Sequence, residues 1–393
     1  MGGEIHIQNY GLIVVGCGLT GAVIARNFAD TKKQKVLILE RRSHTCGNMY
    51  DYVDENGVRV HKYGPHVFHT NTKELVDFIE QYGIWKDFRI KCRVYMKGKY
   101  TPSPFNFQTI DDYYSEDAAE KLKSEIKKEY RGKTKATIVE LLESKNARIK
   151  EYAEFLFQHD YSLYTAKQWG MKPEDVDPVV LKRVPVLFSY EDGYFDDAYQ
   201  KLPENGYQVF FDRLLASDCI DVMLNTDALE HICIKDERVY FDQKLLTVPL
   251  VYTGAVDQLF GCKYGRLPYR SLKFSWDLKQ KKNFQDAPLV AYPEAEGFTR
   301  ITEYNQFTNQ KNNAAGSSLA YEYPLAYEDA SYCEPYYPVF TDESKRLFEK
   351  YQRELKLVPN LYLCGRLAEF KYYNMDQALQ SALNQCKKIC DSP

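Results

Sequence analysis

Three glycines near the N-terminus, Gly16, Gly18 and Gly21, have the spacing that brings a pyrophosphate against bare backbone. Gly16 allows a tight turn, Gly18 lets the phosphates approach, and Gly21 lets a helix close on a strand. Glu40 follows about 20 residues later, where a carboxylate can accept hydrogen bonds from ribose hydroxyls. Together these residues predict a dinucleotide-binding site.

The elements around these residues have the pattern that such a site needs. Leu12–Val15 and Val36–Leu39 are short apolar runs typical of buried strands, and an Ala-rich helix begins between them at Leu19 and Thr20. A helix N-terminus presents free N–H groups and the positive end of its dipole to phosphates. A secretory signal would also contain an apolar run, but residues 1–10 lack a basic leader.

The composition of the chain argues against several classes of function. A chain of 393 residues suits two or three packed units, and its apolar runs are too short to span a membrane. A net charge of −3 gives no general attraction to nucleic acid. The 10 cysteines are scattered without zinc or disulfide spacing, which indicates reduced thiols and a cytoplasmic protein.

Two side-chain types are prominent in the remaining sequence. The 33 tyrosines suit a cleft that grips a sugar, a base or a phosphate. His61, His66 and His69 cluster in a Gly-Pro loop, but their intervals match no standard ligand spacing, so we expect no metal.

The order of segments favours FAD over NAD. A charged helical stretch, expected to be entirely helical, runs from residue 111 to about 168, and β-rich segments follow between 272 and 323. A last strand, Leu361–Cys364, and a last helix, Asp376–Ile389, close the chain. Flavoproteins of the glutathione-reductase type return their final strand and helix to the first unit in this way.

Several longer segments then identify a family. The bacterial UDP-galactopyranose mutases are resembled, in matching order, by Glu40–Asn48, His61–Thr70, Pro104–Asn106, Tyr164–Gly170, Lys182–Val186, Tyr194–Gln200, Tyr269–Phe274, Phe298–Ile301, Glu334–Pro338 and Gly365–Gln377. The similarity runs from about Tyr10 to the C-terminus.

The resemblance implies an α/β fold: a Rossmann-like FAD-binding domain interrupted by a helical domain and a twisted antiparallel β-sheet domain. We expect the FAD-binding domain at 1–88, 200–262 and 341–393, and the helical domain at 107–182. The sheet, or substrate, domain is expected at 89–106, 183–199 and 263–340.

The resemblance also implies an activity. The family interconverts the pyranose and furanose forms of UDP-galactose without net redox change. N5 of reduced FAD attacks the anomeric carbon as the nucleotide diphosphate departs. The expected partners are a UDP-sugar, an external reductant such as NAD(P)H or a reductase, and a second copy of the chain in a homodimer, with no nucleic acid and no membrane insertion.

Residue roles follow from the same resemblance. The catalytic residues are Arg183 and Arg300 on the substrate diphosphate, and His66 beside the flavin. Substrate-binding residues are Asn106, Tyr164, Trp169, Tyr194, Arg270, Tyr337, Tyr372 and Asn374. Cofactor-binding residues are Gly16, Gly18, Leu19, Thr20, Gly21, Glu40, Arg41, Asn48, His66, Gly365, Arg366, Met375 and Asp376.

Three positions depart from the family pattern. Cys46 stands where the family usually has glycine, Asn374 where many members have aspartate, and Leu187 where arginine is common. The sugar is therefore open: an N-acetylated galactose or a TDP-linked deoxyhexose are alternatives. Other functions considered are a flavin amine oxidase or desaturase, a non-catalytic nucleotide-sugar sensor, and an NAD-linked epimerase. The epimerase would need a Tyr-x-x-x-Lys arrangement on a helix of a Rossmann domain, which the interval from Tyr323 to Tyr327 does not supply.

Overall fold

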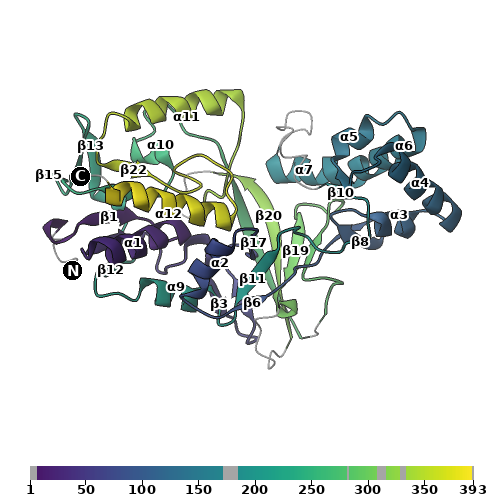
Figure 1. The fold of residues 1–393 in the computed structure, drawn as a ribbon, viewed down its shortest axis with the longest axis horizontal. Coiled ribbons are helices and arrows are strands. Elements are labelled where there is room, and N and C mark those ends of the chain that lie inside the picture. Colours follow the sequence, from purple (N-terminus) through teal and green to yellow (C-terminus); the bar gives the residue numbers. More distant parts are fainter. Residues whose placement is uncertain (1–6, 171–184, 281–282, 308–315, 328–332, 392–393) are drawn as a thin grey trace.

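The protein is built around two large β-sheets, with a group of helices beyond one of them (Figure 1). A computed structural model describes residues 7–170, 185–280, 283–307, 316–327 and 333–391. The parallel sheet lies at one end, the helices within residues 107–169 lie at the other, and the second sheet lies between them (Figure 1).

The parallel sheet carries the predicted dinucleotide unit. Its strand order is β12-β2-β1-β16-β22, and all neighbours run parallel. The strands are β1 (Leu12–Val15), β2 (Val36–Leu39), β12 (Ile220–Met223), β16 (Leu250–Tyr252) and β22 (Leu361–Leu363). The chain changes direction across the sheet between β1 and β16, and ligands of such sheets bind beyond the carboxyl ends of the strands at that point.

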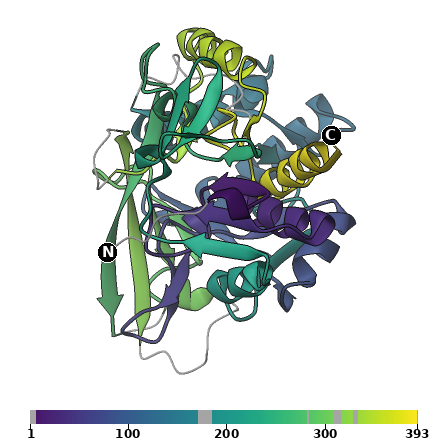
Figure 2. The same ribbon diagram turned by 90° about the vertical axis from the view of Figure 1, so that its left-hand side faces the viewer.

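The two ends of the chain meet on this sheet. Helix α1 (Leu19–Lys32) lies beside helix α12 (Met375–Asp391), and the Cys386 thiol donates to the Ile24 carbonyl at 3.7 Å (Figures 1 and 2). Gly365 follows β22 with φ +103°, and a Cβ there would lie 3.2 Å from Thr20 Oγ1. The last strand therefore leaves the sheet directly against the start of α1.

The second sheet has the order β21-β17-β20-β19-β18-β7-β8. Its strands are β7 (Cys92–Met96), β8 (Lys99–Ser103), β17 (Tyr269–Lys279), β18 (Leu289–Ala291), β19 (Arg300–Glu303), β20 (Ser317–Ala326) and β21 (Tyr337–Pro338). The expected antiparallel arrangement holds except between β18 and β7, which run parallel. The hairpin of β7 and β8 precedes the other strands in sequence, and it joins the sheet through this parallel pair.

The helical group buries its own apolar core. Its elements are α3 (Phe107–Tyr113), α4 (Glu116–Glu129), α5 (Ile138–Leu142), α6 (Ala147–Leu156), a π-helical turn (Phe157–Tyr161) and α7 (Ser162–Trp169). Ile126, Leu141 and Leu156 are among its buried side chains. The stretch expected to be entirely helical also contains a two-residue strand, β9 (Lys135–Ala136), which pairs with β10 (Val186–Leu187).

Smaller elements complete the described chain. Strands β5 (Phe68–Thr70), β11 (Tyr199–Pro203) and β6 (Trp85–Asp87) form a three-stranded sheet. The others include β3 (Asp51–Val53), β4 (Arg59–His61), α2 (Lys73–Glu80), α9 (Tyr207–Leu215), β13 (Ile232–Lys235), β14 (Arg238–Phe241), β15 (Lys244–Leu245), α10 (Val256–Leu259) and α11 (Asp342–Leu355). No helix in the described ranges has the length and apolar character of a membrane span. The division into three domains stays a prediction.

Gly21 gives a direct test of the turn between β1 and α1. A Cβ on Gly21 would lie 2.0 Å from the Gly16 carbonyl oxygen, so Gly21→Ala must push the helix away from the strand. We expect a loss of about 3 kcal/mol in the free energy of unfolding, measured by urea denaturation. Gly83→Ala is the matched control, because a Cβ at Gly83 meets nothing closer than 3.8 Å. Equal stability of the two variants would contradict the close approach at Gly21.

Candidate active site

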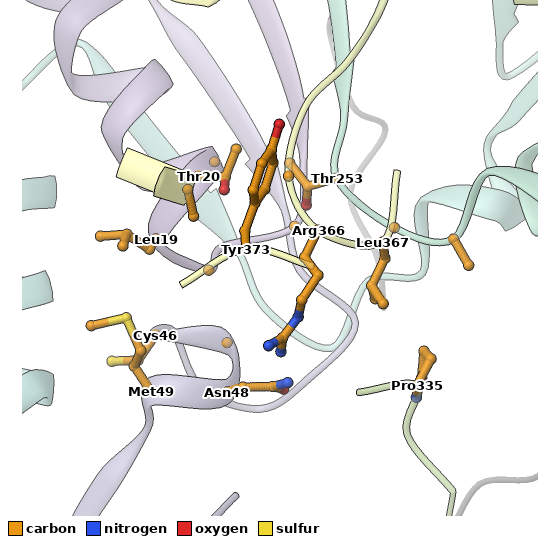
Figure 3. A pocket seen from close by; sticks show the side chains of 18 of the residues that line it. Leu19, Thr20, Cys46, Asn48, Met49, Thr253, Pro335, Arg366, Leu367 and Tyr373 are labelled. Carbon is orange, nitrogen blue, oxygen red and sulfur yellow. The ribbon is translucent and has the colours of Figure 1, made fainter. Parts of the chain in front are cut away.

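A single large cavity of about 780 Å³ joins the glycine turn to the second sheet. Figure 3 shows part of its wall, where Arg366 extends towards Asn48 and Tyr373 lies between Thr20 and Thr253. Its lining includes most of the predicted site residues: Gly16, Gly18, Leu19, Thr20, Gly21, Glu40, Arg41, Asn48, His66, Tyr194, Arg300, Tyr337, Gly365, Arg366, Tyr372, Asn374 and Met375.

The glycine turn opens the first turn of α1 to the cavity. Gly18 is the N-cap of α1, and it has no side chain that could cap the helix. The Glu40 carboxylate at the end of β2 accepts from the backbone N–H of Cys17 at 2.7 Å and of Arg42 at 2.9 Å. A carboxylate can accept about four hydrogen bonds, so Glu40 can also accept hydrogen bonds from hydroxyl groups of a ligand in the cavity.

An ion-pair cluster forms the wall next to Glu40. The Glu334 carboxylate contacts the guanidinium groups of both Arg41 and Arg42. Although burial opposes the charged form, the two arginines lower the pKa of Glu334. Arg42 also donates to Asn48 Oδ1 at 3.0 Å and lies over the Tyr63 ring. Asn48 is therefore held in the wall by Arg42, a residue to which we had assigned no role.

His66 is neutral and oriented. Its Nδ1 lies 2.8 Å from the Gly64 carbonyl oxygen, which can only accept, so Nδ1 carries the proton. Burial is the main cause that lowers the pKa of His66 to about 4; the charges of Arg366 and Arg300 act in the same direction, and the hydrogen bond to Gly64 opposes them. The Nε2 lone pair has no hydrogen-bond partner among the described residues and is available to a donor in the cavity.

The side chains of Arg366, Tyr337 and Tyr372 stack on one another in the cavity wall. The Arg366 guanidinium lies 5.1 Å from the centre of the Tyr337 ring, and Tyr337 stacks on Tyr372 at 5.3 Å with an angle of 8° between the rings. Such cation–π and stacking contacts fix the orientation of all three side chains. Two phenols and a guanidinium thereby present hydrogen-bonding groups around one part of the cavity.

Helix α12 begins at the cavity wall. The backbone N–H of Asn374 donates to Gln377 Oε1 at 3.0 Å, and Met375 is the first residue of the helix. The Asp376 carboxylate instead accepts from the Gln377 N–H at 2.8 Å and is not part of the cavity lining. Asn374 and Met375, but not Asp376, therefore face the cavity.

Arg300 projects from β19, and the Nε edge of its guanidinium group forms an ion pair with Glu322. Its Nε lies 2.7 Å from Glu322 Oε2 on the neighbouring strand β20, directly opposite in the register. Burial alone would lower the pKa of Arg300, but the Glu322 carboxylate raises it, so the guanidinium stays charged. No described residue hydrogen-bonds to the two Nη groups, so both can bind an anion in the cavity.

Two other predicted tyrosines belong to the same region. Tyr194 lines the cavity, and its ring meets that of Phe195 edge-on at 4.8 Å. Tyr164, on α7, is close enough for the charge of Arg300 to act on its phenol, although burial is the larger effect and raises its pKa.

The remaining predicted residues lie outside the cavity lining or outside the described chain. Asn106 is buried as the N-cap of α3, accepting from Gln108 and donating to the Glu191 carbonyl. Arg270, on β17, donates to the Gln168 carbonyl at the end of α7 at 3.1 Å. Trp169 is the last residue of α7, and Arg183 lies outside the described residues.

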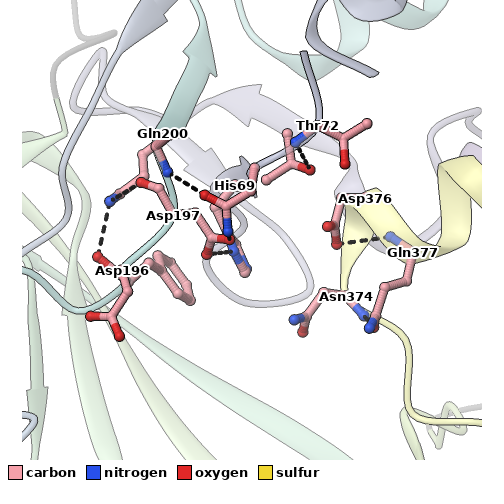
Figure 4. Close-up of polar contacts among 12 residues, drawn as sticks. His69, Thr72, Asp196, Asp197, Gln200, Asn374, Asp376 and Gln377 are labelled. Carbon is pink, nitrogen blue, oxygen red and sulfur yellow. Dashed lines mark hydrogen bonds and ion pairs between the residues drawn. The ribbon is translucent and has the colours of Figure 1, made fainter. Parts of the chain in front are cut away.

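The structure also adds residues that sequence reasoning did not assign. Glu322 holds Arg300, and His69 lines the cavity with Asp197 at its Nδ1 (Figure 4). Both His69 and Asp197 lie in segments that carry the family resemblance, and His69 also belongs to the histidine cluster noted in the sequence. As a whole, the cavity can hold a dinucleotide along α1 and bind a second anion at Arg300.

Comparisons with known proteins agree with this architecture. Residues 159–372 match the UDP-galactopyranose mutase family, and residues 14–82 match an NAD(P)-binding Rossmann-like domain. The chain is 34% identical to a UDP-galactopyranose mutase from Mycoplasma genitalium, over 98% of this chain and 96% of that protein. It is 30% identical to a dTDP-fucopyranose mutase from Escherichia coli, over 96% and 97% of the two chains.

A solved structure shows the same fold. The crystal structure of a reduced UDP-galactopyranose mutase superposes with a TM-score of 0.73 at 15% identity, covering 97% of this chain and 93% of the other. The expected combination of a Rossmann-like unit with inserted helices and sheet is thereby confirmed. With a match over more than half of its length and relatives at 30% and 34% identity, the chain belongs to the UDP-galactopyranose mutase family, and its activity is that of a sugar mutase, an isomerase.

Proposed function

We propose that this protein interconverts UDP-galactopyranose and UDP-galactofuranose with reduced FAD as its cofactor. The proposal rests on one cavity with two features. The first turn of α1, which begins at Gly18 without a side-chain cap, is open to it, and the charged Arg300 lines it with only Nε bound to Glu322. The first feature suits a bound dinucleotide, and the second suits the diphosphate of a nucleotide sugar.

The residues at the α1 end fit FAD. The N–H groups after Gly18 would take the pyrophosphate, and Glu40 would accept from the ribose hydroxyls. Arg366 and the start of α12 at Met375 would lie against the flavin. When bound and reduced, the flavin supplies a nucleophilic nitrogen for the anomeric carbon of the sugar. The positive end of the α12 dipole stabilises negative charge beside it.

Arg300 stabilises the departing diphosphate. Because Glu322 holds Nε, the two Nη groups keep a fixed direction and can bind two phosphate oxygens together. The stacked phenols of Tyr337 and Tyr372 lie around the same cavity, and Tyr194 adds a third. Arg183 is assigned to the diphosphate by the family resemblance alone.

His66 contributes a hydrogen-bond acceptor rather than a charge. Its protonated Nδ1 is held by the Gly64 carbonyl, and its Nε2 lone pair is available to the cavity. With a pKa of about 4, His66 is neutral at neutral pH, so it does not repel the positively charged arginines nearby. We assign His66 to a donor on the cofactor edge.

Two relatives named for different sugars bear on which nucleotide sugar is the substrate. One is named a UDP-galactopyranose mutase and another a dTDP-fucopyranose mutase. We favour UDP-galactose and keep a dTDP-linked deoxyhexose as the second candidate. We also propose a homodimer in the cytoplasm that takes electrons from NAD(P)H or a reductase.

The cofactor is tested on the purified protein. We expect yellow protein that releases FAD on denaturation, identified by chromatography and absorbance. After dithionite reduction without oxygen, it should equilibrate UDP-galactopyranose with UDP-galactofuranose, followed by chromatography beside dTDP-fucose and UDP-N-acetylgalactosamine. Absence of flavin, or equal activity of the oxidised protein, would overturn the proposal. Hydrogen peroxide formation from an amine would indicate an oxidase instead.

The diphosphate assignment is tested at Arg300. Arg300→Ala should lower kcat by about 10²- to 10³-fold, the usual loss when a group that stabilises developing charge is removed, while FAD stays bound. Arg183→Ala should behave similarly. Arg238→Ala is the control, because Arg238 is exposed on β14 and is not part of the cavity lining. Near-normal kcat in Arg300→Ala would remove this residue from the proposed mechanism.

A further inference from the structure

Lys167 is held at three points by one loop of the second sheet. It lies on α7, at the side of the helical group that faces β20 (Figure 1). Its Nζ donates to the carbonyl oxygens of Tyr292 at 2.7 Å, Ala295 at 2.8 Å and Phe298 at 2.9 Å. An ammonium group has three N–H donors, so these contacts can satisfy all of them.

The loop that supplies these carbonyls leads directly to Arg300. It connects β18 to β19 and is closed by a hydrogen bond from the Tyr292 N–H to the Thr299 carbonyl at 2.8 Å. The Thr299 N–H in turn donates to the Glu322 carbonyl at 2.8 Å. Since the three acceptors lie at the start, the middle and the end of this loop, Lys167 fixes the shape of the whole loop.

A second contact from the helical group reaches the same loop. His159 Nδ1, in the π-helical turn before α7, lies 3.0 Å from Glu294 Oε1. The other carboxylate oxygen of Glu294 accepts from the Lys97 N–H, between β7 and β8, at 2.9 Å. The loop is therefore bound to neighbours on two sides, and Lys167 provides the central contact.

Lys167 also links two of the residues assigned to the substrate. Tyr164 lies three residues earlier on α7, so the two side chains are neighbours on the helix surface, and the charge of Arg300 acts on the Tyr164 phenol. The end of α7 is held as well, because the Gln168 carbonyl accepts from Arg270 Nε at 3.1 Å. Lys167 itself is not part of the cavity lining, so its effect on a substrate passes through α7 and the loop.

The charge of Lys167 is costly to place here. Burial lowers its pKa to about 8, and the charge of Asp160 opposes that shift, so the ammonium group is charged at neutral pH. Apolar side chains would join a helix to a sheet without this cost. An ammonium group enclosed by three carbonyls is better explained as a means of fixing direction, which a preorganised anion site needs.

We propose that Lys167 is a positioning residue of the substrate site: its ammonium group locks the loop before β19 to α7, so that Arg300 and Tyr164 meet one nucleotide sugar from fixed positions. The inference rests on the proposed function, because it needs a nucleotide diphosphate at Arg300. It gives the join between the helical group and the second sheet a role in substrate binding and turnover.

Lys167→Met gives the first test, in the reduced holoprotein. We expect FAD to stay bound and kcat for UDP-galactose to fall about 10²-fold, because a misplacement of about 1 Å can cost that much. Hydrogen exchange followed by mass spectrometry should show faster exchange of the amides in residues 292–299. Lys150→Met is the matched control, because Lys150 is exposed on α6. Wild-type kcat or exchange in Lys167→Met, or equal losses in Lys150→Met, would overturn the proposal.

A double-mutant cycle with Arg300→Ala separates positioning from general destabilisation. If Lys167 acts through Arg300, the double variant should be little slower than Arg300→Ala alone, because a guanidinium group that is already misplaced contributes little. Independent losses would multiply instead, and multiplied losses would overturn the positioning role of Lys167 alone. A wild-type protein that neither binds nor converts UDP-galactose would overturn the proposed function itself.

Lys167→Arg gives the same test if the methionine variant does not fold. It keeps a positive charge and N–H donors, but a planar guanidinium group cannot direct three hydrogen bonds to converging carbonyls as an ammonium group does. We expect a stable holoprotein with a lowered kcat and the same non-additivity with Arg300→Ala. Wild-type kcat in Lys167→Arg would contradict the role of the three contacts.

Discussion

The site depends on one buried ion pair between two neighbouring strands. Arg300 and Glu322 face each other across β19 and β20, and the Glu322 side chain is only 2% exposed. Burying two charges is costly, and Glu322 Oε1 has no hydrogen-bond partner among the described residues. The pair is therefore poorly explained as a device for stability. It is well explained as a device that keeps a guanidinium fixed and charged.

The strand that carries Arg300 is itself held in place by hydrogen bonds. Glu303, three residues later on β19, accepts from the N–H groups of Phe284 and Gln285 and from Ser317 Oγ. A carboxylate that is buried but fully hydrogen-bonded fixes the surrounding loops. The position of Arg300 is thus set before any ligand enters, which is the condition for strong electrostatic stabilisation.

The fold could be predicted where local signals were strong. The runs Leu12–Val15 and Val36–Leu39 are apolar throughout, and Gly21 allows the close turn that its spacing predicted. Strands such as β12 and β11 were missed because they are short and mix polar with apolar residues. Their strand conformation depends on partners far away in the sequence, which no local pattern reveals.

In the candidate site too, residues close together in sequence could be predicted, whereas contacts between distant segments could not. Most residues of the glycine turn and of the segment 365–375 line the cavity as expected, because each group is local in sequence. The His69–Asp197 contact joins residues 128 positions apart, so no spacing could indicate it. Asn106 shows a different limit: the same amide can bind a ligand or cap a helix, and here it caps α3.

The packing of α12 on α1 has a consequence for biosynthesis. Helix α12, which packs on α1, follows it by more than 340 residues in the sequence, and β22 joins the parallel sheet only shortly before α12. During translation, apolar surface on α1 and on the parallel sheet therefore stays exposed until β22 and α12 have also emerged. Cofactor loading is in this sense a late event, and a nascent chain of this kind is a natural client for molecular chaperones.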